Sequence, residues 1–131
     1  MTTLEHWFEE VWNQGREVAI DEMMSPNTKG HGLSSPDGNE IDGMVAFKSF
    51  YKTFRATFPD IHIKVEDTVT EGDKTVARCV VTGRHTGDSL GKTPTGKPVK
   101  FTGMCMVRVK DGKIIESWNN FDFMAMYQQM E

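Results

Sequence analysis

The sequence has little cysteine and no long apolar run. Its two cysteines, Cys79 and Cys105, stand far apart without C-x-x-C or cysteine–histidine spacing, which argues against a metal or redox role and favours reduced thiols in the core. No segment approaches the ~20 consecutive apolar residues of a membrane helix. The first residues also lack the basic start and apolar stretch of a signal peptide, so we expect a cytoplasmic protein.

The charge is not strongly of one sign. There are 15 Lys and Arg residues against 19 Asp and Glu residues, and the basic residues are scattered along the chain. This balance argues against nucleic acid and against an anionic membrane as partners. The 37% apolar and 26% charged residues are typical of a folded protein. Because 131 residues are enough for one core and too few for two, we expect a single domain over residues 1–131.

The first half of the chain has helical periodicity. Thr2 and Glu5 form the T-x-x-E pattern of a capping box, and the helix that follows should end near Gly15. A second, short helix is predicted over residues 17–24. A third should run from its N-cap, Asp42, to the proline at position 59. Apolar side chains share one face of the first and third helices: Leu4, Trp7, Phe8, Val11, Trp12, Phe47, Phe50, Tyr51, Phe54 and Phe58.

From residue 61 the period changes to the alternation typical of strands. Hairpin turns are expected at residues 71–74 and 111–112, and a last helix at 123–129. Turn residues dominate positions 27–39, with a short strand near 29–33. Helices followed by antiparallel strands predict an α+β fold in which the helices cover one face of the sheet. Both faces of the last hairpin are apolar, so we expect a second copy of the chain to cover the other face, giving a homodimer.

A two-residue turn at positions 111–112 fixes the expected register of the last hairpin. In this register Trp118, Asn120 and Asp122 share a face, with Cys105 opposite Trp118. A carboxylate beside an indole and beneath an aromatic helix face is the type of environment that raises the pKa of an acid, as general acid or base catalysis requires. The alternative is that Asp122 only caps the last helix.

Histidines are the other candidates for proton transfer. His85 ends a strand beside a glycine-rich loop, where it could donate to a substrate oxygen or shuttle a proton, or simply anchor the loop. His31 is a second candidate. The loop contains the pattern G-x-x-x-x-G-K at residues 91–97, but Pro98 and a strand follow instead of a helix, so we do not expect it to bind phosphate.

The inner end of the aromatic core is a candidate binding site. If the sheet curves away from the helices, it leaves an apolar pocket with few polar groups, which is the usual form of a small-molecule site. We expect six side chains to contribute to it: His31, Phe50, Phe54, Cys105, Trp118 and Asn120. No metal ligand set is recognisable in the sequence.

Several short motifs together resemble the SnoaL-like polyketide (ester) cyclases. They are W-N-Q-G at residues 12–15, F-P-D at 58–60, G-R-H-T-G at 83–87, P-T-G-K at 94–97, D-G-K-I at 111–114, E-S-W at 116–118, and Asp122. Their order and spacing match over nearly the whole chain. The resemblance implies the nuclear-transport-factor-2-like cone, a curved antiparallel sheet backed by N-terminal helices. It also implies intramolecular aldol cyclisation of a small, largely apolar carbonyl or ester substrate, with no cofactor.

The resemblance further implies roles for single residues. An aspartate near the end of the last strand is the acid/base residue of the characterised cyclases, and Asp122 is similar to it by motif. Their pocket also uses a histidine on the penultimate strand, where the expected register places Val107. His85, His31 or Asn120 would then have to supply the missing donor.

Two other functions stay open on the same fold. Epoxide hydrolysis or steroid-type isomerisation needs a carboxylate pair or an acid–arginine–acid set. Glu116 lies too far along the strand to pair with Asp122, and Arg108 is expected on the opposite face. The other alternative is a non-catalytic module that binds an apolar ligand, with Asp122 as a helix cap.

Overall fold

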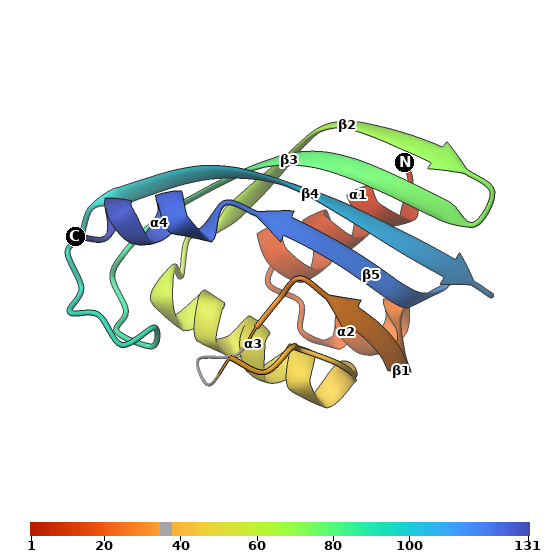
Figure 1. The fold of residues 1–131 in the computed structure, drawn as a ribbon, viewed down its shortest axis with the longest axis horizontal. Helices are drawn as coiled ribbons and strands as arrows, with labels where there is room; N and C mark the ends of the chain where they lie inside the picture. Colours follow the sequence, from red (N-terminus) through yellow and green to blue (C-terminus); the bar gives the residue numbers. More distant parts are fainter. Residues whose placement is uncertain (35–37) are drawn as a thin grey trace.

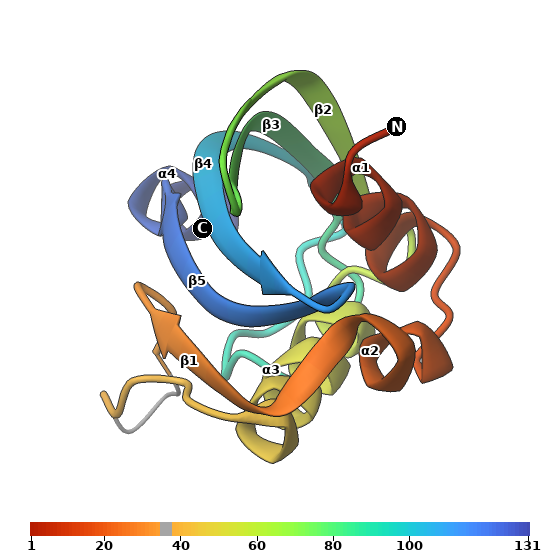
Figure 2. The ribbon, with the colours of Figure 1, turned by 90° about the vertical axis from the view of Figure 1, so that its right-hand side faces the viewer.

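The computed structural model of the chain describes residues 1–34 and 38–131, and its centre is a five-stranded sheet of order β1-β5-β4-β3-β2. The strands are β1 (Met24–His31), β2 (His62–Glu71), β3 (Lys74–Arg84), β4 (Pro98–Lys110) and β5 (Lys113–Phe121). Strand β1 runs parallel to β5, and the other neighbours are antiparallel. The sheet is curved and open, with helices on its concave side (Figures 1 and 2). The predicted α+β class is confirmed.

The helices are α1 (Thr3–Trp7), a π-helical turn η1 (Phe8–Asn13) that continues it, α2 (Val18–Met23), α3 (Met44–Thr57) and α4 (Phe123–Gln129). The capping box of α1 and both hairpin turns are confirmed. Strand β1 starts earlier than the predicted short strand, and positions 35–37 of the predicted turn segment lie outside the described residues. Within the described ranges, no helix has both the length and the apolar character needed to cross a membrane.

The prediction that Asp42 caps α3 is wrong. The N-cap is Gly43, which has φ of 85° and no side-chain cap bond. The Asp42 carboxylate instead accepts a hydrogen bond from the backbone N–H of Gly30 in β1, at 3.0 Å. The residue that was expected to begin the helix therefore ties the segment before the helix to the edge of the sheet.

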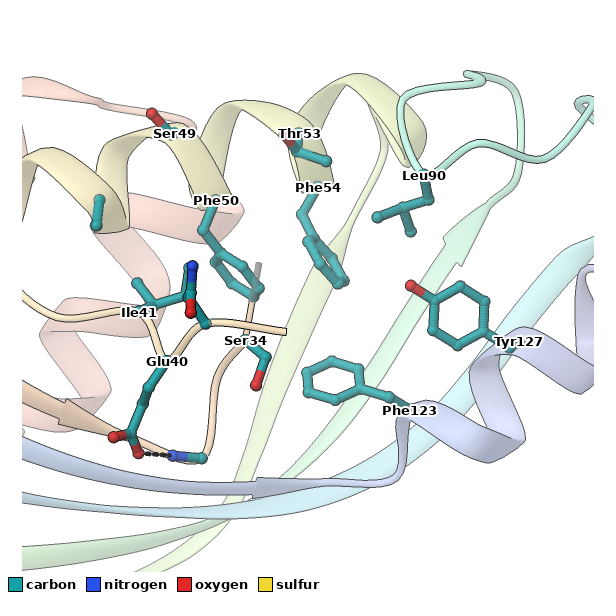
Figure 3. Close-up of a pocket in the computed structure, with 13 residues that line it drawn as sticks. Ser34, Glu40, Ile41, Ser49, Phe50, Thr53, Phe54, Leu90, Phe123 and Tyr127 are labelled. Carbon is teal, nitrogen blue, oxygen red and sulfur yellow. Dashed lines mark hydrogen bonds between the residues drawn. The ribbon is translucent and has the colours of Figure 1, made fainter. Parts of the chain in front are cut away.

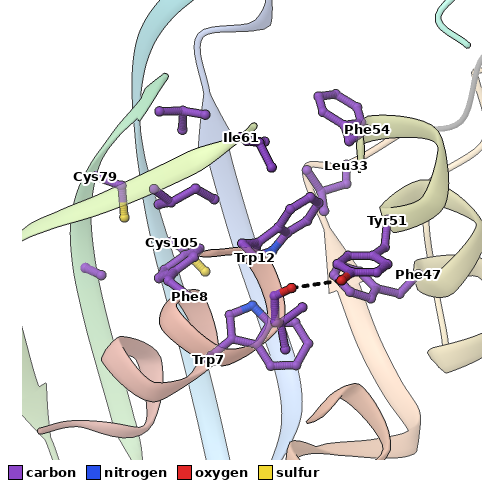
Figure 4. Close-up of a cluster of buried hydrophobic side chains, with 14 of the residues drawn as sticks. Trp7, Phe8, Trp12, Leu33, Phe47, Tyr51, Phe54, Ile61, Cys79 and Cys105 are labelled. Atoms are coloured by element: carbon purple, nitrogen blue, oxygen red, sulfur yellow. Dashed lines mark hydrogen bonds between the residues drawn. The ribbon is translucent and has the colours of Figure 1, made fainter. Parts of the chain in front are cut away.

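The core lies between the helices and the concave face of the sheet. Trp12 of η1 packs against α3, with its ring centroid 5.0 Å from that of Tyr51 and 6.3 Å from that of Phe47. The Tyr51 hydroxyl donates to the backbone carbonyl of Val11 at 2.9 Å, so the two helical layers are also joined by a buried hydrogen bond (Figure 4). The aromatic face predicted for α3 is thus mostly core.

The register predicted for the last hairpin is wrong by one residue. Val109 pairs with Ile114 as expected, but Arg108 pairs with Glu116, so Ile115 has no partner in β4. This extra residue is a β-bulge, and because side chains alternate along a strand, it turns every later side chain of β5 to the other face.

The bulge decides which polar side chains face the interior. Cys105, which points into the core, pairs with Asn119 instead of Trp118. Asn119 and Phe121 therefore lie on the concave face, whereas Trp118 and Asn120 lie on the convex face.

The edge strand β2 is joined to the helical layer by one side chain. Asn13 Nδ2 donates to the carbonyl of Ile63 at 2.9 Å, and Asn13 Oδ1 accepts from the N–H of Ile63 at 2.7 Å. Glu9 holds the same amide group, accepting from Nδ2 at 3.1 Å. The amide of Asn13 thus completes the hydrogen bonding of an edge residue as a neighbouring strand would.

We expect Asn13→Asp to lower the free energy of unfolding by about 1–3 kcal/mol, because a carboxylate oxygen would then face the carbonyl of Ile63. Urea denaturation measures the change. The matched control is Asn27→Asp, the same substitution at an exposed position, which should change stability little. Equal effects of the two variants would contradict the role given to Asn13.

Candidate functional site

A cavity of about 650 Å³ opens at the wide end of the cone, between α3, α4, the segment after β1 and the loop that joins β3 to β4 (Figure 3). Its walls are apolar: Phe50 and Phe54 come from α3, Phe123 from α4 and Leu90 from the loop. Polar residues border it as well: Ser34, Asn39, Glu40, Ser49, Thr53 and Tyr127. The arrangement matches the usual form of a small-molecule site, which is an apolar hollow with few polar groups.

A second, narrow space of about 60 Å³ lies beneath η1 and α3. Phe50, Phe54 and Phe123 border both spaces, so the two are neighbours in the core. Aromatic and aliphatic side chains and one amide, Asn119, line the inner space. Asn119 Nδ2 donates to the carbonyl of His31 at 3.1 Å, which fixes the amide group at the sheet.

Of the residues predicted for the site, Phe50 and Phe54 line the cavity. Cys105 is 4% exposed and lies outside the lining of both spaces. Burial raises the pKa of its thiol, and burial also raises the pKa of Cys79 to about 11. Both groups therefore stay protonated at neutral pH, and neither is suited to act as a nucleophile.

Asp122 is exposed and caps α4, accepting a hydrogen bond from the N–H of Ala125 at 3.0 Å through Oδ1. With Asn120 and Met104 it borders an open hollow near the end of β5, and none of the three lines the cavity. The helix-cap alternative thus describes the position of Asp122. Its acid/base role stays a prediction that rests on the resemblance.

His85 anchors the loop between β3 and β4. It is fully buried, and its Nδ1 lies 3.1 Å from Thr95 Oγ1. Its backbone N–H donates to the carbonyl of Lys97 at 3.0 Å, which closes the base of the loop that carries Leu90 to the cavity. His85 itself does not line the cavity, so the structure shows an anchor, and a role in proton transfer stays a prediction.

His31 lies on the convex side, at the end of β1. Its ring stacks on Trp118 with centroids 5.4 Å apart and 17° between planes, and its Nε2 is 2.9 Å from Glu116 Oε2. Its Nδ1 lies 3.8 Å from Oε1 of Glu40, which borders the cavity. His31 therefore lies outside the cavity and contacts one of its lining residues, Glu40.

An acid–arginine–acid set is present, but it is outside the cone. Arg108 Nε lies 3.4 Å from Asp73, and Arg108 Nη1 lies 3.7 Å from Glu116. None of these three residues lines the cavity. Among residues 1–34 and 38–131, no group of three His, Cys, Asp or Glu side chains is placed to hold a metal ion.

The whole chain resembles known proteins in sequence and in shape. The family model of the SnoaL-like polyketide cyclases matches residues 2–130. The chain belongs to the SnoaL-like polyketide cyclase family. The nogalonic acid methyl ester cyclase of Streptomyces nogalater is 29% identical over 127 residues, which cover 92% of this chain and 89% of that protein.

Solved structures show the same SnoaL-like fold. IdmH of Streptomyces antibioticus, assigned as a polyketide cyclase, is 32% identical with a TM-score of 0.82, covering 97% of this chain and 94% of IdmH. A protein of Jannaschia sp. CCS1 assigned as a SnoaL-like polyketide cyclase is 25% identical with a TM-score of 0.85. The match covers 98% of this chain and 88% of the Jannaschia chain.

Most residues that line the cavity and the inner space were not expected from the sequence, among them Asn119, Glu40, Leu90 and Tyr127. Asn119 was missed because of the bulge, since its neighbour Asn120 was assigned to the inner face. Glu40, Leu90 and Tyr127 come from two loops and the last helix, and no periodicity says which side of a docked loop meets a cavity. For Asn119, the available signal was the pair of asparagines at positions 119 and 120, either of which could face the interior.

We expect both thiols of this SnoaL-like chain to be protected from alkylation by their burial. Iodoacetamide at pH 8 should modify Cys79 and Cys105 at least tenfold more slowly in the folded chain than in urea, because the thiolate is the reactive form. Intact-mass measurements over time record the rates. Fast labelling of either residue in the folded chain would contradict its place in a closed core.

Proposed function

We propose that this SnoaL-like protein binds a small, largely apolar carbonyl or ester ligand in the cavity and closes a ring in it by acid/base chemistry, without a cofactor. The observation that carries the proposal is the cavity of about 650 Å³, whose aromatic walls also border the inner space that Asn119 lines. Its size suits a ligand of two or three rings. The relative from Streptomyces nogalater supports the same reaction type, since it is named as a cyclase of a methyl ester.

The reaction needs a base beside the ligand and donors for a developing enolate. A base removes the proton from the carbon next to a carbonyl, that carbon then bonds to a second carbonyl carbon, and the resulting alkoxide takes up a proton. The resemblance gives the proton transfer to Asp122. Glu40 is the other candidate base, because it is the acidic residue among those that line the cavity; its carboxylate accepts a hydrogen bond from the N–H of Gly32 at 3.3 Å and would have to turn toward the ligand (Figure 3).

The first experiment incubates the protein with nogalonic acid methyl ester and follows a cyclised isomer by chromatography with mass detection. We expect product formation above that of the heat-denatured protein. Glu40→Gln should lower turnover about 10²–10⁴-fold, the usual contribution of a general base, while the ligand still binds. Unchanged turnover in Glu40→Gln would remove Glu40 from the reaction.

Two substitutions at Asp122 separate catalysis from capping. Asparagine caps a helix as well as aspartate does, whereas alanine costs about 1 kcal/mol. We expect Asp122→Asn to keep both turnover and melting temperature, and Asp122→Ala to lower the melting temperature. If Asp122→Asn instead folds normally and loses turnover, Asp122 is the base, as the resemblance implies, and Glu40 is not.

A second candidate function is binding without turnover. The amide of Asn119, which cannot accept a proton as a base does, is the polar side chain on the inner space. Ligand binding by the wild-type protein with no product from any ester tested would favour this candidate.

We also propose that two copies of the chain pair through the convex face of the sheet. Val76, Met106 and Trp118 lie side by side across β3, β4 and β5 on that face, and the neighbouring Met104 is 48% exposed. No helix covers this side of the sheet in Figure 1. A second copy would remove this apolar row from water.

Sedimentation at micromolar concentration should therefore show a dimer, and Met104→Glu should shift it toward the monomer by placing a charge in the interface. Met124→Glu is the matched control, because Met124 is 73% exposed on α4. A wild-type monomer, or equal behaviour of the two variants, would contradict pairing through the sheet.

A further inference from the structure

Tyr127 directs a hydroxyl group into the cavity. Its ring extends from α4, and its oxygen points toward the space between Phe54, Leu90 and Phe123 (Figure 3). The hydroxyl makes no hydrogen bond to the residues that the structure describes, and 37% of the residue is exposed. The other tyrosine, Tyr51, is different, since its hydroxyl is bonded to a backbone carbonyl in the core.

The framework of α4 fixes the place of this hydroxyl. Asp122 caps the first turn of the helix, and Met126 and Met130 are buried beneath it. At the other end, Gln129 pairs with the backbone of β4, accepting from the N–H of Lys100 at 2.7 Å and donating to its carbonyl at 2.9 Å. The helix is therefore held at both ends, and Tyr127 approaches the cavity from a preorganised position.

The surroundings of the hydroxyl favour a ligand oxygen as its acceptor. Phe54, Leu90 and Phe123 offer no acceptor, and a phenol donor that loses water to an apolar ligand without gaining a partner costs free energy. Electron density on a carbonyl or enolate oxygen complements the O–H donor of Tyr127.

We propose that the Tyr127 hydroxyl donates a hydrogen bond to the carbonyl or enolate oxygen of the ligand, and so selects ketones and esters over hydrocarbons of the same shape. The inference rests on the proposed binding function and names the donor within the same cavity. Asp122 then serves the site as a positioning residue, since it caps the helix that presents Tyr127.

The test uses two probes of nearly equal shape: 2-acetylnaphthalene, and 2-isopropenylnaphthalene, in which a CH₂ group replaces the carbonyl oxygen. Their dissociation constants are measured by quenching of tryptophan fluorescence. The wild-type protein should prefer the ketone. Tyr127→Phe should weaken ketone binding about 3–10-fold, the usual effect of one hydrogen bond, and leave alkene binding unchanged.

Tyr51→Phe is the matched control, because it removes the same atom from a tyrosine outside the cavity lining. It should lower the melting temperature and leave the ratio of the two dissociation constants at the wild-type value. Circular dichroism and the melting temperature of Tyr127→Phe confirm that this variant is folded.

The outcomes separate the two proposals. If both probes bind the wild-type protein and Tyr127→Phe changes neither constant, or changes both equally, the role of Tyr127 is overturned while the binding function stands. If neither probe binds the wild-type protein, the binding function fails and the inference fails with it.

Discussion

One inserted residue in β5 decides which of the later side chains in that strand face the interior. Ile115 has no partner in β4, and the alternation of side chains is reversed beyond it. Without this bulge Trp118 and Asn120 would face the core, and Asn119 would face solvent. The amide of Asn119 therefore faces the inside of the cone because of that one irregularity.

The curvature of the sheet explains why a cavity exists at all. The aromatic side chains of η1 and α3 fill the concave face near the middle of the sheet, where only about 60 Å³ is left. Toward the wide end the two layers diverge, and the cavity of about 650 Å³ is enclosed by elements that meet there from distant parts of the sequence. Their attachments are polar: the buried His85 holds the loop, and Asp42 holds the segment before α3. Apolar packing thus closes the cone, and hydrogen bonds shape its mouth.

Most of the fold could be predicted because its signals are local. The capping box at Thr2, the turns at positions 72–73 and 111–112, and the bounds of the last helix all depend on a few adjacent residues. The resemblance to the SnoaL-like cyclases, carried by spaced motifs, is confirmed by the family match. The site was harder to predict. Asp42 was expected to cap α3 on local grounds, but its carboxylate accepts a hydrogen bond from the N–H of Gly30 in β1 instead.

The bulge shows why a residue-level prediction of the site fails while the fold prediction holds. A hairpin keeps its turn, its strands and its overall burial whether or not one residue is inserted. Apolar periodicity therefore gives only a weak sign of the inserted residue, because Ile114 and Ile115 are both apolar and either can face the core. The polar residues beyond the insertion carry no such tolerance, because the inserted residue decides whether each of them faces the interior or the convex side. For Asp122 the consequence is larger still. It shares a motif with the acid/base residue of the family, yet in this chain its carboxylate is bonded to the N–H of Ala125 at 3.0 Å. That bond is the contact of a helix cap, and a sequence motif carries no information about which partner a carboxylate binds in the folded chain.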